Sequence, residues 1–138
     1  SGTELSENVA FIIADCGYTS ARDEIAHVLK TSYRLPRFPI LVISDMLTRA
    51  IAGFGLSEYS TLDALAENKI PVLFVHGDAD TFVPSYMSEK NYEACKAPKE
   101  LLIIKGSPHA VNYALGRKEY EKKIIEFMDK YAVKKVQG

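Results

Sequence analysis

Apolar and polar positions alternate in blocks along the chain, and the blocks are of two kinds. Three short, continuous apolar runs stand at Val9–Ala14, Pro71–Val75 and Leu101–Ile104. Continuous runs of this length are typical of strands buried on both faces of a parallel sheet. Longer stretches with helical spacing separate and follow them. This order predicts a parallel sheet covered by helices on both faces, a three-layer α/β fold.

End signals place the helices. Three helices are predicted between the first two strands: one through about Lys30 after the capping residues Ser20 and Asp23, one over 40–54 stopped by Gly53 and Gly55, and a short one over 61–69 capped by Ser60 or Thr61. A fourth is expected from Pro84 to about Cys95. The stretch Lys118–Tyr131 carries apolar side chains on one helical face and predicts a final amphipathic helix.

Polar clusters follow each predicted strand: Asp15-Cys16-Gly17, His76 to Asp80, and Gly106 to His109. In open parallel sheets ligands bind at the carboxyl ends of the strands, so the clusters should share one edge. Asp80 and His109 are 29 residues apart (109 − 80), yet a strand–helix–strand crossover would bring them together. We therefore expect their side chains to lie within hydrogen-bond range, roughly 2.6–3.2 Å.

An acid beside a histidine is the arrangement that general base catalysis uses. The carboxylate fixes the imidazole tautomer and stabilises the imidazolium, while the imidazole activates a serine or cysteine. An ion pair that only stabilises the loops is the other interpretation of Asp80 with His109. His76 is expected to be a core histidine bonded to backbone, and His27 a helix residue at the surface or in a lid.

Two motifs resemble a known family. The string "HGDADTFVP" resembles the acid-loop pattern H-G-x-x-D-x-x-V-P of α/β-hydrolases, and "GSPHAVNY" resembles their histidine loop. The chain order of acid before histidine also fits that family. "IIADCGYTS" is similar to the segment after the nucleophile helix in the esterase- and peptidase-like branch with Bem46-type and acyl-aminoacyl-peptidase-type enzymes.

The resemblance implies a fold and a chemistry. Residues 1–138 would form one partial α/β-hydrolase domain, the last three strands of the family sheet, with residues 18–69 as a helical lid. Asp80 matches the catalytic acid, His109 the catalytic base and Asp78 a variable position. The implied activity is hydrolysis of a small-molecule ester or amide by a Ser-His-Asp triad, with no cofactor or metal.

The chain departs from the family pattern at the nucleophile. It contains no G-x-S-x-G; the nearest string is "GFGLSEY" around Ser57, which follows a predicted helix and lacks the second glycine. Neither Ser57, Ser44 nor Ser107 is expected to face His109. We therefore expect the nucleophile to lie upstream of Ser1, and the chain to be a C-terminal fragment that is inactive alone.

Two other functions stay open at this stage. A hydrolase based on Cys16 would be complete within the chain, although "DCGY" lacks the elbow glycines and free cysteine is more often a buried apolar residue. A non-catalytic domain would use an exposed sheet edge or the lid to bind a partner. The run Val9–Ala14 supplies such an edge, which predicts a homodimer or association with the upstream part of the same protein.

Composition narrows the remaining classes. The 138 residues are 47% hydrophobic and 25% charged with a net charge of −1, so no basic footprint for nucleic acid is present. No stretch is apolar over the length of a bilayer span. Cys16 and Cys95 match no metal-binding spacing and favour a reducing, cytoplasmic location, although a parent protein could carry an N-terminal anchor or signal. The acids Asp15, Asp78 and Asp80 lack a His/Cys ligand set, so metal binding is not expected.

Overall fold

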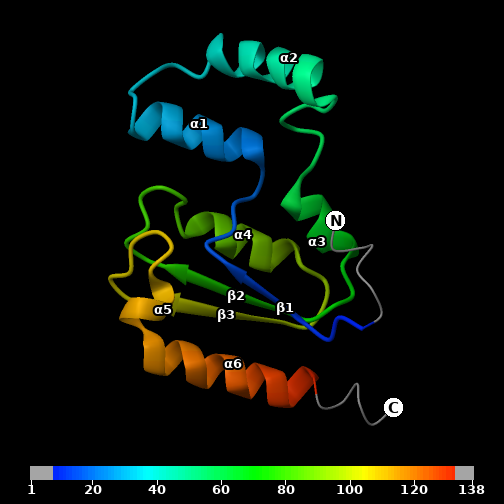
Figure 1. Ribbon diagram of the computed structural model, residues 1–138, viewed down its shortest axis with the longest axis vertical. Helices are drawn as coiled ribbons and strands as arrows, with labels where there is room; N and C mark the ends of the chain where they lie inside the picture. Colours follow the sequence, from blue (N-terminus) through cyan, green and yellow to red (C-terminus); the bar gives the residue numbers. More distant parts are fainter. Residues whose placement is uncertain (1–7, 133–138) are drawn as a thin grey trace.

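The computed structural model describes residues 8–132, and its centre is a sheet of three parallel strands. The strands are β1 (Ile12–Asp15), β2 (Val72–Gly77) and β3 (Lys99–Ile104), in the spatial order β1-β2-β3 (Figure 1). Ile12 pairs with Val72, which in turn pairs with Lys99. All six residues of β2 are buried, as its continuous apolar run predicts. The parallel sheet is therefore confirmed.

The first strand is shorter than predicted. Strand β1 begins at Ile12 rather than Val9, and the Ile12 N–H donates to the Pro71 carbonyl at 2.8 Å. Strand β2 begins only at Val72, so the ladder offers the residues before Ile12 no partner along β2. Phe11, which precedes the strand, instead packs against the core between the sheet and the final helix.

Helices cover both faces of the sheet, which confirms the three layers. On one face Leu73, Val75, Leu102 and Ile104 pack against α6 (Arg117–Tyr131). Its residues Tyr120 and Phe127 lie on the apolar face that the sequence predicted. On the other face Val72 and Phe74 pack with Leu65 of α3 (Thr61–Glu67) and with Cys95, which follows α4 (Tyr86–Ala94).

Two details of the later helices differ from expectation. Helix α4 begins at Tyr86 with Ser85 as its N-cap, so Pro84 precedes the helix and its carbonyl accepts from the Met87 N–H at 2.9 Å. A short helix, α5 (Asn112–Leu115), follows the loop after β3 and was not predicted. A single turn has no hydrophobic period by which a sequence pattern could reveal it.

Residues 18–69 form a helical segment that leaves the sheet and returns close to its starting point. It contains α1 (Ala21–Thr31), α2 (Ile40–Ala52) and α3, and Figure 1 shows α1 and α2 stacked beyond α4. A β-bridge between Ser20 and Ser60 joins its two ends, and the Thr61 N–H donates to the Thr19 carbonyl at 2.9 Å.

The predicted end signals of this segment act as expected. The Ser20 hydroxyl accepts from the Asp23 N–H, and Ser60 caps α3 in the same way. Gly53 ends α2 with φ 81°, a left-handed conformation that glycine adopts without strain.

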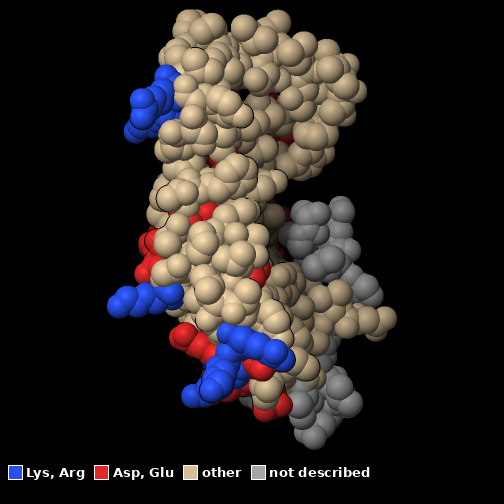
Figure 2. All heavy atoms as spheres, turned by 60° about the vertical axis from the view of Figure 1, so that its left-hand side comes forward, with Lys and Arg blue, Asp and Glu red and all other residues tan. Residues whose placement is uncertain are grey.

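Charged and apolar side chains are distributed differently over the two halves of the molecule. In Figure 2, side chains of both signs are interspersed over the sheet half, while the visible face of the helical segment is mostly uncharged. Helix α2 buries one residue, Leu41, and exposes a set of large apolar side chains: Val42, Ile43, Met46, Leu47 and Ile51. Within residues 8–132, no helix has both the length and the apolar character needed to cross a membrane.

Candidate active site

Asp80 stands in the turn after β2, with its side chain fully buried. One carboxylate oxygen, Oδ1, accepts from the backbone N–H groups of Phe82 at 3.0 Å and Val83 at 2.9 Å. The other, Oδ2, accepts from Nδ1 of His109 at 2.8 Å. The expected approach of Asp80 and His109 is therefore confirmed. Backbone amides and imidazole N–H together fix the orientation of a carboxylate that water does not reach.

The acid loop also holds the histidine loop in place. The Gly106 N–H donates to Oδ1 of Asp78 at 2.5 Å, and the Ala79 N–H donates to the Ser107 carbonyl at 3.2 Å. A Cβ on Gly77 would stand 2.0 Å from the same Ser107 oxygen, so only glycine allows this approach. Gly77 and Asp78 at the end of β2 thus hold the loop that carries His109.

His76 is a fully buried histidine with both ring nitrogens bonded, as expected. Nε2 lies 2.7 Å from the Val83 carbonyl, which can only accept, so Nε2 carries a proton. Nδ1 lies 2.6 Å from the Ser88 hydroxyl, within hydrogen-bond distance. Nε2 also lies 3.2 Å from Oδ2 of Asp80, a contact that the sequence analysis missed. His76 therefore contacts the same carboxylate oxygen as His109.

The ligand atoms of Cys16, His76 and Asp80 lie within 4.8 Å of one another, close enough to consider a metal ion. The protonation pattern argues against one. Nε2 of His76 holds its proton for Val83, and Nδ1 is bonded to Ser88. A metal ligand must be an unprotonated nitrogen or a thiolate. His76 and Asp80 are bonded to each other, and Cys16 is bonded to Asp15 and Asn112, so the three side chains do not form a prepared cation site.

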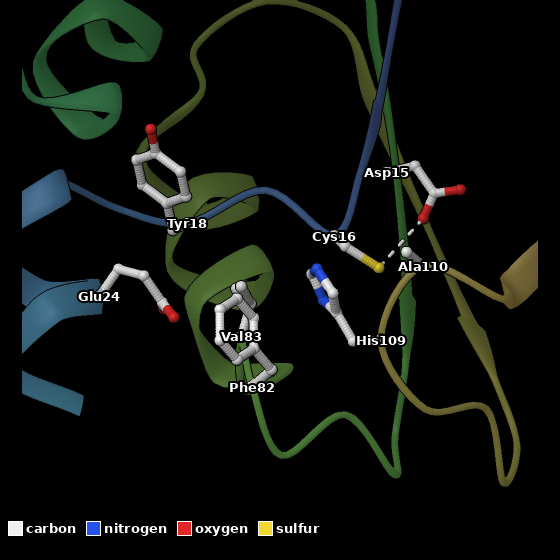
Figure 3. Close-up of a pocket in the computed structure, with 8 residues that line it drawn as sticks. All are labelled: Asp15, Cys16, Tyr18, Glu24, Phe82, Val83, His109 and Ala110. Atoms are coloured by element: carbon white, nitrogen blue, oxygen red, sulfur yellow. Dashed lines mark hydrogen bonds between the residues drawn. The ribbon is translucent and has the colours of Figure 1, made fainter. Parts of the chain in front are cut away.

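His109 lies at the wall of a cavity of about 420 Å³, shown in Figure 3. The wall also includes Asp15, Cys16, Tyr18, Glu24 and Phe82. The His109 side chain is 36% exposed, and its ring centre lies 5.0 Å from that of Phe82. Because Nδ1 donates to Asp80, Nε2 is left as a hydrogen-bond acceptor, and no described residue bonds to it. An imidazole so held can take a proton from a group that enters the cavity.

Cys16 also faces this cavity, in a left-handed conformation with φ 54°. Its thiol donates to Oδ1 of Asp15 at 3.3 Å, and its sulfur accepts from Nδ2 of Asn112 at 3.2 Å. Burial, and less so the Asp15 carboxylate, raise the pKa of the Cys16 thiol to about 11. The thiolate is the nucleophilic form of cysteine, so this environment disfavours a reaction at Cys16.

The three serines considered as nucleophiles do not reach the cavity. Ser44 is on α2, Ser57 is exposed after α2, and Ser107 is buried with its hydroxyl 3.3 Å from the Pro108 carbonyl. None of them is part of the cavity wall. The expectation that none of them faces His109 is confirmed.

Several residues of this edge were not found from the sequence. Asn112, fully buried on α5, donates to Oδ1 of Asp15 at 2.5 Å, and the Tyr120 hydroxyl donates to Oδ2 of Asp15 at 2.9 Å. His27 of α1 donates from Nε2 to the Thr81 carbonyl at 3.0 Å and so ties the helical segment to the acid loop. Asn, Tyr and His are common on helix surfaces, so no sequence pattern indicates which of them makes such a long-range hydrogen bond.

Comparison with known proteins shows the family of the chain. Residues 6–111 match the family described as "Serine hydrolase (FSH1)". The chain belongs to this serine hydrolase family. YqkD, an uncharacterised protein of Bacillus subtilis (strain 168), is 34% identical over 129 residues, which cover 94% of the chain and 42% of YqkD. Non-heme chloroperoxidase CPO-A1 of Kitasatospora aureofaciens is 30% identical over 83 residues, 59% of the chain and 30% of that protein.

Solved structures show the fold of this family member. The Pyrococcus furiosus esterase Pf2001 superposes with a TM-score of 0.67 at 18% identity, over 94% of the chain and 48% of the esterase. Pyrococcus horikoshii acylaminoacyl peptidase gives 0.64 at 18% identity, over 92% of the chain and 21% of the peptidase. The three strands and their helices are thus part of an α/β-hydrolase fold, and the chain spans less than half the length of these relatives.

Proposed function

We propose that this chain provides the acid and the base of a Ser-His-Asp triad in an esterase- or peptidase-like serine hydrolase. The observation that carries the proposal is the 2.8 Å hydrogen bond from Nδ1 of His109 to the buried carboxylate of Asp80. It leaves Nε2 facing a cavity, which is the arrangement that general base catalysis needs. Membership of a serine hydrolase family supports the same chemistry.

In this mechanism His109 accepts the proton of a serine hydroxyl as the serine attacks an ester or amide carbonyl. The resulting imidazolium is stabilised by Asp80, whose position its backbone and His76 contacts fix in advance. His109 then gives the proton to the leaving alcohol or amine. The acyl-serine is hydrolysed by water through the same sequence, with His109 again as base.

The serine itself is proposed to lie outside residues 1–138. The sequence has no G-x-S-x-G, and no serine among residues 8–132 lines the cavity beside His109. Relatives more than twice as long as the matched part leave room for a nucleophile elbow outside it. The chain alone would then lack both the nucleophile and the oxyanion-hole donors, so we expect it to be inactive. Residues 18–69 are proposed to act as the lid.

The test compares the isolated chain with the protein expressed from the complete open reading frame. A fluorophosphonate probe and hydrolysis of p-nitrophenyl acetate report the active serine. The proposal expects no labelling and no turnover in the isolated chain, and both in the complete protein. His109→Gln should abolish both in the complete protein. Turnover by the isolated chain, or full activity of the His109→Gln variant, would contradict the proposal.

A second proposal concerns association. Strand β1 pairs only with β2 among the described strands, and its residues Ile12, Ile13 and Ala14 are partly exposed. An apolar edge of this kind is a template for pairing with another chain. We propose that the isolated chain forms a homodimer through this edge or stays bound to the upstream part of its protein. Light scattering at micromolar concentration tests it, since a monodisperse monomer without a bound fragment would refute the idea.

A further inference from the structure

Two acidic side chains, Asp15 and Glu24, line the cavity. Of the two, only the carboxyl group of Glu24 lacks a hydrogen-bond partner among the described residues. Glu24 projects from α1, and Figure 3 shows its carboxyl group pointing toward Phe82 and Val83. Both carboxyl oxygens are shielded from water and have no hydrogen-bond partner. Asp15, the other acid of the wall, is bonded to Asn112 and Tyr120.

A shielded carboxyl group without partners destabilises the fold, because nothing replaces the water it gives up. Burial raises the pKa of Glu24, and the charge of Asp80 adds to this effect while His27 and His109 oppose it. The carboxyl group of Glu24 bonds to no other described group, so no hydrogen bond offsets this cost. A group that persists at such a cost beside an active site points to a ligand.

The chemistry of the surroundings narrows the ligand. A second hollow of about 720 Å³ adjoins the first, and Tyr18 lines both. Its wall carries the aromatic rings of Phe54 and Tyr59. It also carries three acids: Glu58, which pairs with Arg49 at 3.5 Å, Asp63 and Glu67. Neither hollow has a lysine or arginine among its described lining residues. Carboxylates interleaved with aromatic rings are the surroundings that favour an ammonium group.

We propose that Glu24 is a specificity-determining residue and that the substrate is an ester or amide bearing a primary ammonium group. The ammonium would enter between Tyr18 and Phe82, and the Glu24 side chain would turn into the cavity to meet it with a charge-assisted hydrogen bond. This inference rests on the proposed hydrolase function, because only a hydrolase has an ester or amide substrate. Binding of the ammonium group can nevertheless be measured separately from hydrolysis.

The test measures binding without turnover, on protein from the complete open reading frame. The probes are n-butylammonium and n-butanol, which share an alkyl chain and differ in charge, and NMR titration gives the dissociation constants. A charge-assisted bond predicts that n-butylammonium binds about tenfold or more tightly than n-butanol. Glu24→Gln should reduce this preference to about threefold or less, because it keeps the shape and removes the charge. The matched control Glu93→Gln, exposed on α4 and outside both hollows, should keep it.

A second readout needs no variant. The pKa of Glu24, followed by the carbon chemical shift of its carboxyl group, should fall when n-butylammonium is bound, because the cation stabilises the ionised form. Equal binding of the two probes, a preference that survives Glu24→Gln, or a pKa of Glu24 that the probe does not move would each overturn the inference. A protein that hydrolyses esters but shows no preference would refute this inference alone. A preference without hydrolysis would refute only the proposed function.

Discussion

The loops around Asp80 and His109 differ sharply from the helical segment that faces them across the cavity. In the loops, both oxygens of Asp80 and both nitrogens of His76 are bonded, and the two loops are joined by backbone contacts. In the helical segment, the carboxyl group of Glu24 has no hydrogen-bond partner among the described residues, and α2 exposes most of its apolar side chains. The loops are held by redundant hydrogen bonds, whereas α1 and α2 of the helical segment are sparsely held.

Under the proposed function, the difference corresponds to two demands on a hydrolase. A triad works only if its acid and base are held in a productive geometry before substrate arrives, and redundant hydrogen bonds do this. A substrate-binding segment has to admit, enclose and release molecules, so it is drawn from the less stable part of a fold. His27 of α1 bonds to Thr81 of the acid loop, and Asn91 of α4 donates to the carbonyls of Gly17 and Tyr18, where the helical segment begins.

The largest effect should come from the centre of the rigid region. Asp80→Asn keeps the shape but supplies an amide where His109 needs an acceptor, so kcat of the complete protein should fall by about 10⁴. Steady-state kinetics on p-nitrophenyl acetate measure it. Asp129→Asn, an exposed change on α6, is the matched control and should leave kcat unaltered. An Asp80→Asn variant with more than about a tenth of the activity would remove Asp80 from the triad.

The thiol at the same edge should be unreactive. With a pKa of about 11, Cys16 has about 300-fold less thiolate near neutral pH than a free cysteine of pKa about 8.5. Iodoacetamide alkylation, followed by mass spectrometry in a Cys95→Ser background, should be slow near neutral pH. Because the thiolate is the reactive form, the rate should rise about tenfold per pH unit until about pH 11. Fast alkylation of Cys16 that also stops ester hydrolysis would support the alternative hypothesis of a Cys16-based hydrolase.

Adding a methyl group at Gly77 should test how closely the acid loop and the histidine loop approach each other. Gly77→Ala places a Cβ 2.0 Å from the Ser107 carbonyl oxygen, which must move, so the free energy of unfolding should fall by about 2–3 kcal/mol. His109 moves with that loop, so activity of the complete protein should fall too. Gly17→Ala is the control, since its new Cβ meets only Nδ2 of Asn91 at 3.7 Å. Denaturant unfolding that shows equal stability for the two variants would contradict the close approach.

The smallest effect should come from the sparsely held region. Ile51 on α2 is 84% exposed, so Ile51→Ser should change the free energy of unfolding by about 0.5 kcal/mol or less. Denaturant unfolding of the isolated chain measures it. A loss above about 2 kcal/mol would mean that the α2 face is buried in solution, and the contrast between the two regions would disappear.

Local signals predicted most of the elements, and the errors have definite causes. The predicted caps at Ser20 and Ser60 and the stop at Gly53 are confirmed, because each acts on backbone groups within a few residues of itself. The beginning of β1 was wrong because strand limits depend on the partner, and β2 begins only at Val72. The beginning of α4 was wrong because Pro84 fits the turn before a helix as well as its first position.

The sequence by itself determined the parallel sheet, its covering helices and the meeting of Asp80 with His109. It did so because parallel strands bring their carboxyl ends to one edge whatever lies between them. Tertiary structure alone decided that His76 braces Asp80, that Gly77 admits the Ser107 loop and that Glu24 stands unpartnered in the cavity wall. These contacts depend on side-chain directions and distances between segments far apart in the chain, and no periodicity or local propensity encodes them.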